Sequence, residues 1–177
     1  MRQLPACVSR TIRGLQVLSR SGLALSGLAL LLLAGPVQAQ ALPKPEIIGS
    51  SWVYRTQGLY HNVRDDLIGA IEDEGLVISY TAHLASMLRR TADATGAEVQ
   101  VYDNAQSLLF CKADLTYELT VRNPHNITLC PYSISIYTLK KEPETVFLAI
   151  RSPELEQADY AAIHQLLEQI IAATLTW

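Results

Sequence analysis

Two cysteines, Cys111 and Cys130, offer the widest choice of chemistry in this sequence. Both lie in the stretch 110–132, FCKADLTYELTVRNPHNITLCPY. In an oxidising compartment two such thiols join in a structural disulfide. As free thiols they exchange with other disulfides, and together with a histidine they bind soft metal ions such as copper or zinc. The residue types alone leave these three alternatives open.

The thiol-exchange alternative rests on the neighbours of the two cysteines. Lys112 follows Cys111, and its positive charge would lower the pKa of the thiol. Pro131 follows Cys130 and removes a backbone donor near the sulfur. However, the sequence has no Cys-x-x-Cys, which is the usual spacing of a redox pair. Exchange is therefore a weaker interpretation than a structural disulfide.

A metal site would need a third ligand, and His125 lies between the two cysteines in the sequence. The spacing of Cys111, His125 and Cys130 matches neither a zinc ribbon nor a zinc finger, and the Cys-x-x-Cys-His of covalently attached haem is absent. The sequence therefore predicts no cofactor. If a metal is bound, these three residues are its expected ligands.

The candidate ligand-binding residues are His83, Lys112, His125 and Tyr132. His83 stands where an expected strand passes into an expected helix, and backbone N–H groups at the start of a helix can hold anions. His164, near the polar border of the last expected helix, is predicted to be solvated. The motifs of serine hydrolases, zinc proteases, phosphate loops and dinucleotide sites do not occur. We therefore predict a binding domain rather than an enzyme, and no catalytic residue.

The N-terminus has the three parts of a secretory signal peptide. A leader with four arginines and no acidic residue comes first, 21–35 is almost wholly apolar, and Val37 and Ala39 form a small-residue cleavage site. The apolar run is shorter than the about 20 residues that span a bilayer. We therefore expect the signal peptide 1–39 to be removed, with cleavage after Ala39 or Ala41, and the rest to be exported to the periplasm.

Export changes the charge balance of the chain. Four of the 14 basic residues and none of the 17 acidic residues lie in 1–39, so the net charge changes from −3 to −7 when that segment is removed. An acidic domain is poorly suited to nucleic acid or anionic lipid, both of which bind through Lys and Arg. The expected partners are therefore a small-molecule ligand or a protein, with no nucleic acid and no membrane contact after cleavage. Self-association as a homodimer, through a sheet face or an edge strand, is a further expectation.

Export also bears on the two cysteines, because paired thiols outside the cytoplasm usually oxidise. Closing a loop of about 20 residues would stabilise the fold by roughly 3 kcal/mol. We therefore predict a Cys111–Cys130 disulfide, with thiol exchange or metal handling by the same residues as the alternative function.

Periodicity and turn residues predict one domain over 52–177, preceded by a Pro-, Gly- and Ser-containing linker over 40–51. Strands are expected at 51–58, 76–80, 98–102, 107–111, 132–139 and 145–151, the last two joined by a turn at 142–145. Helices are expected at 61–75, 83–96 and 154–177. This order predicts an α+β fold with an antiparallel sheet backed by helices.

The expected helices have start and stop signals and an apolar face. Asn62 is expected to cap the first helix, and Gly75 and Gly96 to end the first two. The residues expected to face inward are Val63, Leu67, Ala70 and Ile71 in the first helix, Leu84, Met87, Leu88 and Ala92 in the second, and Tyr160, Ile163, Leu167, Ile170 and Leu175 in the last. The segment 115–121 alternates like a strand, although Asp114 could cap a short helix there instead.

Three segments, 75–91, 110–115 and 123–139, resemble the periplasmic two-cysteine branch of the bacterial family called domain of unknown function 302. The resemblance extends over about 52–175, and Lys112 departs from the small polar residue expected at its position. It implies a compact α+β layout similar to the halves of the TATA-binding protein. It also implies that 114–122 is a short helix, and it carries no assigned activity.

Overall fold

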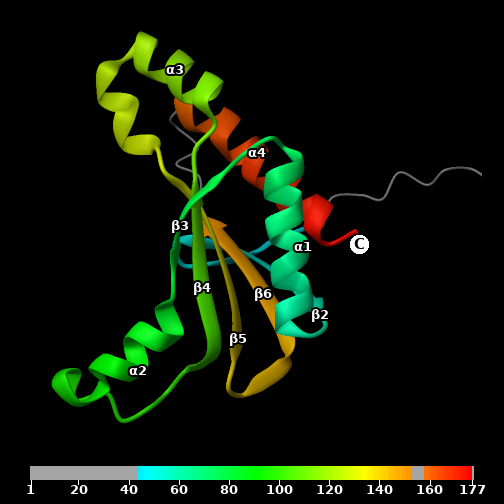
Figure 1. The fold of residues 1–177 in the computed structure, drawn as a ribbon, viewed down its shortest axis with the longest axis vertical. Coiled ribbons are helices and arrows are strands. Elements are labelled where there is room, and N and C mark those ends of the chain that lie inside the picture. The colour runs from blue at the N-terminus through cyan, green and yellow to red at the C-terminus, as the bar shows by residue number, and fades with distance from the viewer. Residues whose placement is uncertain (1–43, 153–157, 177) are drawn as a thin grey trace, which may run out of the picture. The chain divides into compact units, whose positions relative to one another are not determined.

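Six strands form one antiparallel sheet in the order β1-β2-β6-β5-β4-β3 (Figure 1). The computed structural model describes residues 44–152 and 158–176. The strands are β1 Glu46–Ile48, β2 Ser51–Gln57, β3 Ile78–Ala82, β4 Tyr102–Phe110, β5 Tyr132–Leu139 and β6 Glu142–Arg151. The helices are α1 Tyr60–Asp73, α2 Leu84–Thr95, α3 Ala113–Arg122 and α4 Ala158–Thr174, with a 3-10 helix η1 at Pro124–Leu129. The predicted α+β class, an antiparallel sheet backed by helices, is confirmed.

One face of the sheet carries the core. In β5 every second residue, from Tyr132 to Thr138, is buried. The neighbours of these residues on β4 and β6 face the same way, and α1 and α4, which lie against each other, cover them. Alternation of this kind is typical of an antiparallel sheet with one packed face. The largest fully buried side chains are Phe110, Leu67, Ile71, Leu108, Leu119, Ile134, Ile136, Leu148, Ile163, Leu167, Ile170 and Ile171.

The helix α1 buries the face that its sequence predicts but does not use the predicted cap. Leu59 holds the N-cap position without a side-chain hydrogen bond, and the backbone N–H of Asn62 donates to the Leu59 carbonyl. Asn62 is therefore not the cap. Gly75 follows the helix with a φ of 73°, as its stop role requires. The buried residues are Val63, Leu67, Ala70 and Ile71.

The helix α2 does not bury the face predicted for it. Met87 and Leu88, expected to point inward, are 40% and 47% exposed, and only Ala85 in the first turn is buried. The reason is geometric, because α2 packs mainly on β4 and projects from the end of the sheet, where its later turns meet no second layer (Figure 1). Gly96 ends the helix in the left-handed conformation, as predicted.

The helix α3 forms in spite of a strand-like alternation, which confirms the helix implied by the family resemblance. Leu119 is its only buried residue, and Tyr117 and Val121 remain exposed. Lys112 holds the N-cap position, so Asp114 is not the cap, although its carboxylate accepts a hydrogen bond from the backbone of Leu115 at 2.7 Å. The alternation of apolar and polar residues in 115–121 therefore does not indicate a strand here.

The strand boundaries differ from prediction at four places, one of which is β3, predicted at 76–80 and found at Ile78–Ala82. β4 begins only at Tyr102, and 98–101 belongs to no strand. The hairpin turn is Lys140–Lys141 rather than 142–145, because Leu139 pairs with Glu142 and β6 already includes Pro143. The short strand β1 lies in the stretch expected to be a linker.

The two edges of the sheet are short or irregular. β1 has 3 residues and pairs with β2 through Glu46–Ile48. At the other edge, β3 has 5 residues and its register against β4 shifts between Ile78 and Tyr80. Neither edge therefore presents a long regular ladder.

The helix α4 packs its apolar stripe on the sheet as predicted. Ile163, Leu167 and Ile170 are fully buried, and Tyr160 and Leu175 are partly buried against the core. The segment 153–157, at the predicted start of this helix, and the predicted signal peptide 1–39 lie outside the described residues. Within the described ranges, no helix has both the length and the apolar character needed to cross a bilayer.

Candidate functional site

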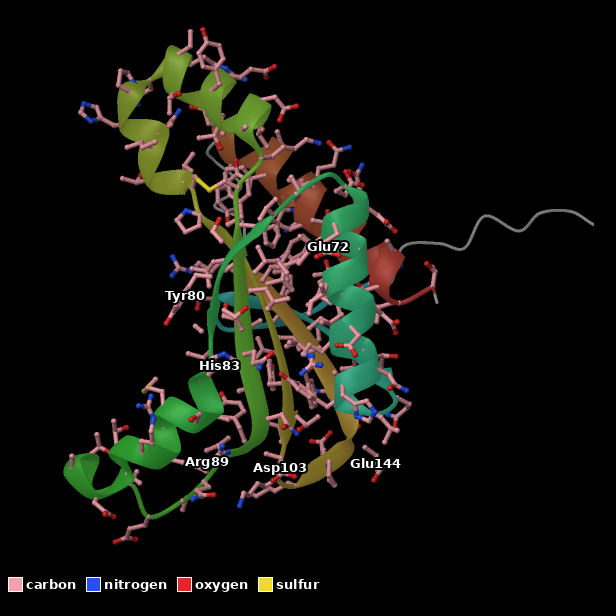
Figure 2. The ribbon with its side chains drawn as sticks, in the orientation of Figure 1. Glu72, Tyr80, His83, Arg89, Asp103 and Glu144 are labelled. Carbon is pink, nitrogen blue, oxygen red and sulfur yellow. A yellow bond between two sulfur atoms is a disulfide. The ribbon has the colours of Figure 1, made fainter. Side chains whose placement is uncertain are left out.

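The two cysteines form a disulfide at one end of the sheet, as predicted (Figure 2). Cys111 directly follows the last residue of β4, and Cys130 is separated from the start of β5 by one residue, Pro131. Their Cα atoms are 5.7 Å apart, within the range of ordinary disulfides. Phe110 and Tyr132 pair across the two strands. The disulfide therefore closes the segment 112–129, which contains α3 and η1, at the point where it leaves the sheet. We call this segment the α3–η1 excursion.

The side chains around the disulfide belong to both the core and the excursion. The rings of Phe110 and Tyr132 meet edge to face with centroids 6.3 Å apart. The hydroxyl of Tyr132 lies 3.1 Å from Oγ1 of Thr116 on α3, so this bond ties α3 to the sheet. Burial raises the pKa of Tyr132, a shift that the hydrogen bond with Thr116 partly opposes.

Lys112 and His125 take different places near the disulfide. Nζ of Lys112 lies 3.9 Å from a carboxylate oxygen of Glu74, so it links the start of α3 to the end of α1. His125 is exposed in η1, where its backbone N–H donates to Asn123. Within the described ranges no group of three or more His, Cys, Asp or Glu side chains could hold a metal ion. The three residues proposed as metal ligands are therefore not gathered into a metal site.

A cavity of about 600 Å³ opens beside the disulfide; we call it the disulfide pocket. Leu109 and Ser133, which pair across β4 and β5, form part of its wall, and Arg151 at the end of β6 lies on its border. The remaining lining residues are Thr128, Leu129, Pro131, Tyr132, Ser152 and Tyr160. Of the predicted ligand-binding residues, only Tyr132 lines this pocket.

The lining of the disulfide pocket combines apolar surface with a single cationic group. Leu109, Leu129 and Pro131 supply the apolar part, and Ser133 adds a hydroxyl. Among the described lining residues the only charged group is the Arg151 guanidinium, which forms no salt bridge in that part of the chain. Such a lining suits a ligand with an apolar body and one acidic group.

His83 lies at a different part of the sheet. Its Nδ1 is 3.0 Å from Nε2 of Gln106 on β4. Gln106 is five residues before Cys111 along an extended strand, roughly 17 Å away at 3.3 Å per residue. His83 and Tyr132, predicted together as ligand-binding residues, therefore line separate cavities.

The sequence did not predict a buried polar network that lies between β2 and α4. The Tyr54 hydroxyl donates to one carboxylate oxygen of Glu168 at 3.3 Å, and the other lies 3.2 Å from Nδ1 of His164. The imidazole packs edge to face on Trp52 with centroids 4.4 Å apart. The prediction that His164 is solvated is wrong, because the buried face of α4 is wide enough to include the residue beside Ile163.

This network predicts a loss of stability at alkaline pH. Burial raises the pKa of Tyr54 far above its ordinary value. The negative charge of Glu168 and the hydrogen bond to this residue raise it further. A tyrosine whose folded pKa is raised contributes stability below the unfolded pKa of about 10 and loses it as pH rises further. For each such tyrosine, the free energy of unfolding should fall by about 1.4 kcal/mol per pH unit above pH 10. In urea unfolding at pH 9 and pH 11, Tyr54→Phe should lose less stability than the wild type.

The control for this measurement is Tyr80→Phe, a change at an exposed position on β3. It should follow the wild type at both pH values. Equal losses in Tyr54→Phe and the wild type would show that Tyr54 does not carry the alkaline transition.

Comparison with known proteins gives a fold but no activity. No family model matches the chain, and no curated protein matches it. Among solved structures it is similar to the crystal structure of an uncharacterized conserved protein, DUF302, from Bacillus stearothermophilus. The two share 13% identity with a TM-score of 0.50, over 73% of this chain and 94% of the other. This likeness supports the α+β layout; the two-cysteine periplasmic branch stays a prediction.

Proposed function

We propose that the chain is an exported, non-enzymatic binding domain, held together by the Cys111–Cys130 disulfide. It takes up a small ligand with an apolar body and one acidic group in the disulfide pocket. The observation that carries this proposal is the described lining of that pocket, in which Arg151 is the only charged residue among apolar and hydroxyl groups. Apolar side chains together with polar groups that fix the orientation of a ligand are a feature of small-molecule sites.

The size and position of the disulfide pocket support the proposal. Its volume of about 600 Å³ lies within the roughly 300–1,000 Å³ of small-molecule sites. Leu129 and Pro131 flank Cys130, so the disulfide fixes this wall relative to β4. A wall that is already in place reduces the ordering cost of binding.

Export is the second part of the proposal, and it rests on the sequence of 1–39 together with the disulfide. A basic, apolar and small-residue leader is typical of secreted proteins, and disulfides persist in oxidising compartments. The periplasm satisfies both conditions. The ligand is therefore expected to be a solute of that compartment.

Anilinonaphthalene sulfonate, an aromatic body with one acidic group, is a suitable probe. The full chain would be expressed in a bacterial host, recovered from the periplasm and titrated by fluorescence. Arg151→Gln should weaken binding about tenfold or more, because a charge-assisted hydrogen bond is lost. Ser133→Trp should weaken it at least as much by filling the pocket.

The matched control is Lys140→Gln, which removes one positive charge from the exposed hairpin turn. It should bind the probe as the wild type does. Unchanged affinity in both Arg151→Gln and Ser133→Trp would place the probe elsewhere and overturn the assignment of the pocket.

A further inference from the structure

A second cavity, of about 350 Å³, lies between the starts of α1 and α2 and the strand β4. Four of its lining residues are arginines or histidines: His61, Arg64, His83 and Arg89. We call this cavity the basic cleft. Figure 2 shows His83 where β3 passes into α2, with Arg89 further along that helix and Asp103 nearby on β4.

The charge of the basic cleft is opposite to that of the domain around it. The net charge of the whole chain is −3, yet among the described residues that line the cleft only Asp103 is acidic. Arg89 donates to the backbone carbonyl of Asp103 at 3.5 Å and has no salt bridge within the described residues. Arg64 is held by Asp65, with N–O distances of 3.0 and 2.7 Å. Arg89 is therefore the arginine of the cleft that forms no salt bridge within the described residues, with Asp103 as the acidic residue beside it.

Two further side chains of the cleft have defined surroundings. Nδ1 of His83 lies 3.0 Å from Nε2 of Gln106 on β4, so this contact orients the imidazole ring in the cleft. Tyr60 also lines the cleft, and its buried hydroxyl has no hydrogen-bond partner within the described residues. Burial raises the pKa of Tyr60 to about 12, partly opposed by the charge of Arg64. Because this hydroxyl is itself buried, it is not counted among the donors that a ligand in the cleft would meet.

The backbone adds to this field. The N-cap residues Leu59 and His83 make no side-chain cap hydrogen bond, so the first-turn N–H groups of α1 and α2 are not capped by side chains. The starts of both helices border the cleft through Tyr60, His61 and Ser86. The partial positive charge at a helix N-terminus favours an anion there.

We propose that the basic cleft binds a phosphate or sulfate group, either as the free oxyanion or as a small monoester. Arg89 supplies the charge, and His83, Ser86 and the two helix starts supply hydrogen-bond donors. A cavity of about 350 Å³ leaves room for a short organic substituent on the anion. This site is independent of the disulfide pocket, because the two cavities share no lining residue.

The test is calorimetric titration of the full chain with inorganic phosphate and, separately, with sulfate. Arg89→Gln should weaken binding at least tenfold. The matched control is Arg90→Gln, its exposed neighbour on α2, which lies outside the cleft lining and should change affinity less than twofold. Arg151→Gln should have no effect here, so failure of this proposal and failure of the disulfide pocket are distinguishable.

The source of the anion is separated by two further titrations. Glycerol phosphate in solution should bind with the same dependence on Arg89, whereas vesicles of phosphatidylglycerol should bind the domain only if the group is a lipid headgroup. Equal weakening by Arg89→Gln and Arg90→Gln would indicate diffuse electrostatics and overturn the site. Absence of phosphate and sulfate binding in the wild type would overturn it as well.

Discussion

Replacing both Cys111 and Cys130 by serine should lower the free energy of unfolding by roughly 3 kcal/mol. The bond closes a loop of about 20 residues, and without it the unfolded chain regains the entropy of that loop. The excursion that it closes buries few residues of its own, Leu119 in α3 and none in η1. Urea unfolding of the wild type and the double variant measures the loss, and the melting temperature should fall by roughly 10 °C.

The control is the wild-type protein treated with a strong reductant, which should unfold at the midpoint of the double variant. Intact-mass measurement should show the two-dalton loss of a disulfide, and the bond should survive mild thiol reductant. Opening of the bond under mild reductant with no change in stability would favour thiol exchange. Stoichiometric copper or zinc in the purified protein would favour the metal alternative.

Phe110→Ala should cost about 3–5 kcal/mol, the range for removing a large aromatic side chain from a core. Phe110 is fully buried on the packed face of β4, and its ring supports Tyr132 on the neighbouring strand. Alanine would leave a cavity under the disulfide that the surrounding sheet is unable to fill by a small shift. Chemical unfolding measures the change.

The exposed aromatic Tyr117 on α3 provides the control for this core variant. It is 71% exposed, so Tyr117→Ala should change stability by no more than about 0.5 kcal/mol. A cost below about 1 kcal/mol for Phe110→Ala would mean that the ring contributes little to the core.

Elements with a strong local pattern were predictable from the sequence. The segment 132–139 alternates between apolar residues and serine from Tyr132 to Ile136, and the structure has β5 over the predicted residues 132–139. The helix α1 buries the four residues that its periodicity selects, and Gly75 ends it. In these elements local pattern and tertiary packing agree, which makes the prediction secure.

Elements whose partners lie far away in the sequence were not predictable. Met87 and Leu88 have the spacing of a buried helix face, but α2 extends past the sheet and leaves them exposed. In α3, Tyr117 and Val121 alternate with polar residues and are exposed, because Leu115 and Leu119, one turn apart, are the residues of this helix that pack on the core. Periodicity records which residues could pack, and the position of the second layer decides which of them do.

The candidate site was predictable at the disulfide but only in part beyond it. Cys111 and Cys130 carry a recognisable signal, whereas Arg151 and Arg89 are single charged residues with no motif around them. Each becomes notable only when strands and helices from distant parts of the chain form a cavity next to it. No periodicity or spacing within one sequence indicates which distant elements come together around a cavity.

The irregular sheet edges have a consequence for the behaviour of the protein at high concentration. A long flat edge strand can recruit further chains into aggregates, but β1 is only 3 residues long and follows Lys44 and Pro45, and β3 is bent by its register shift. Addition of strands from another molecule is therefore disfavoured at both edges. A homodimer, which stays a prediction, would have to form through the open face of the sheet or through the helices.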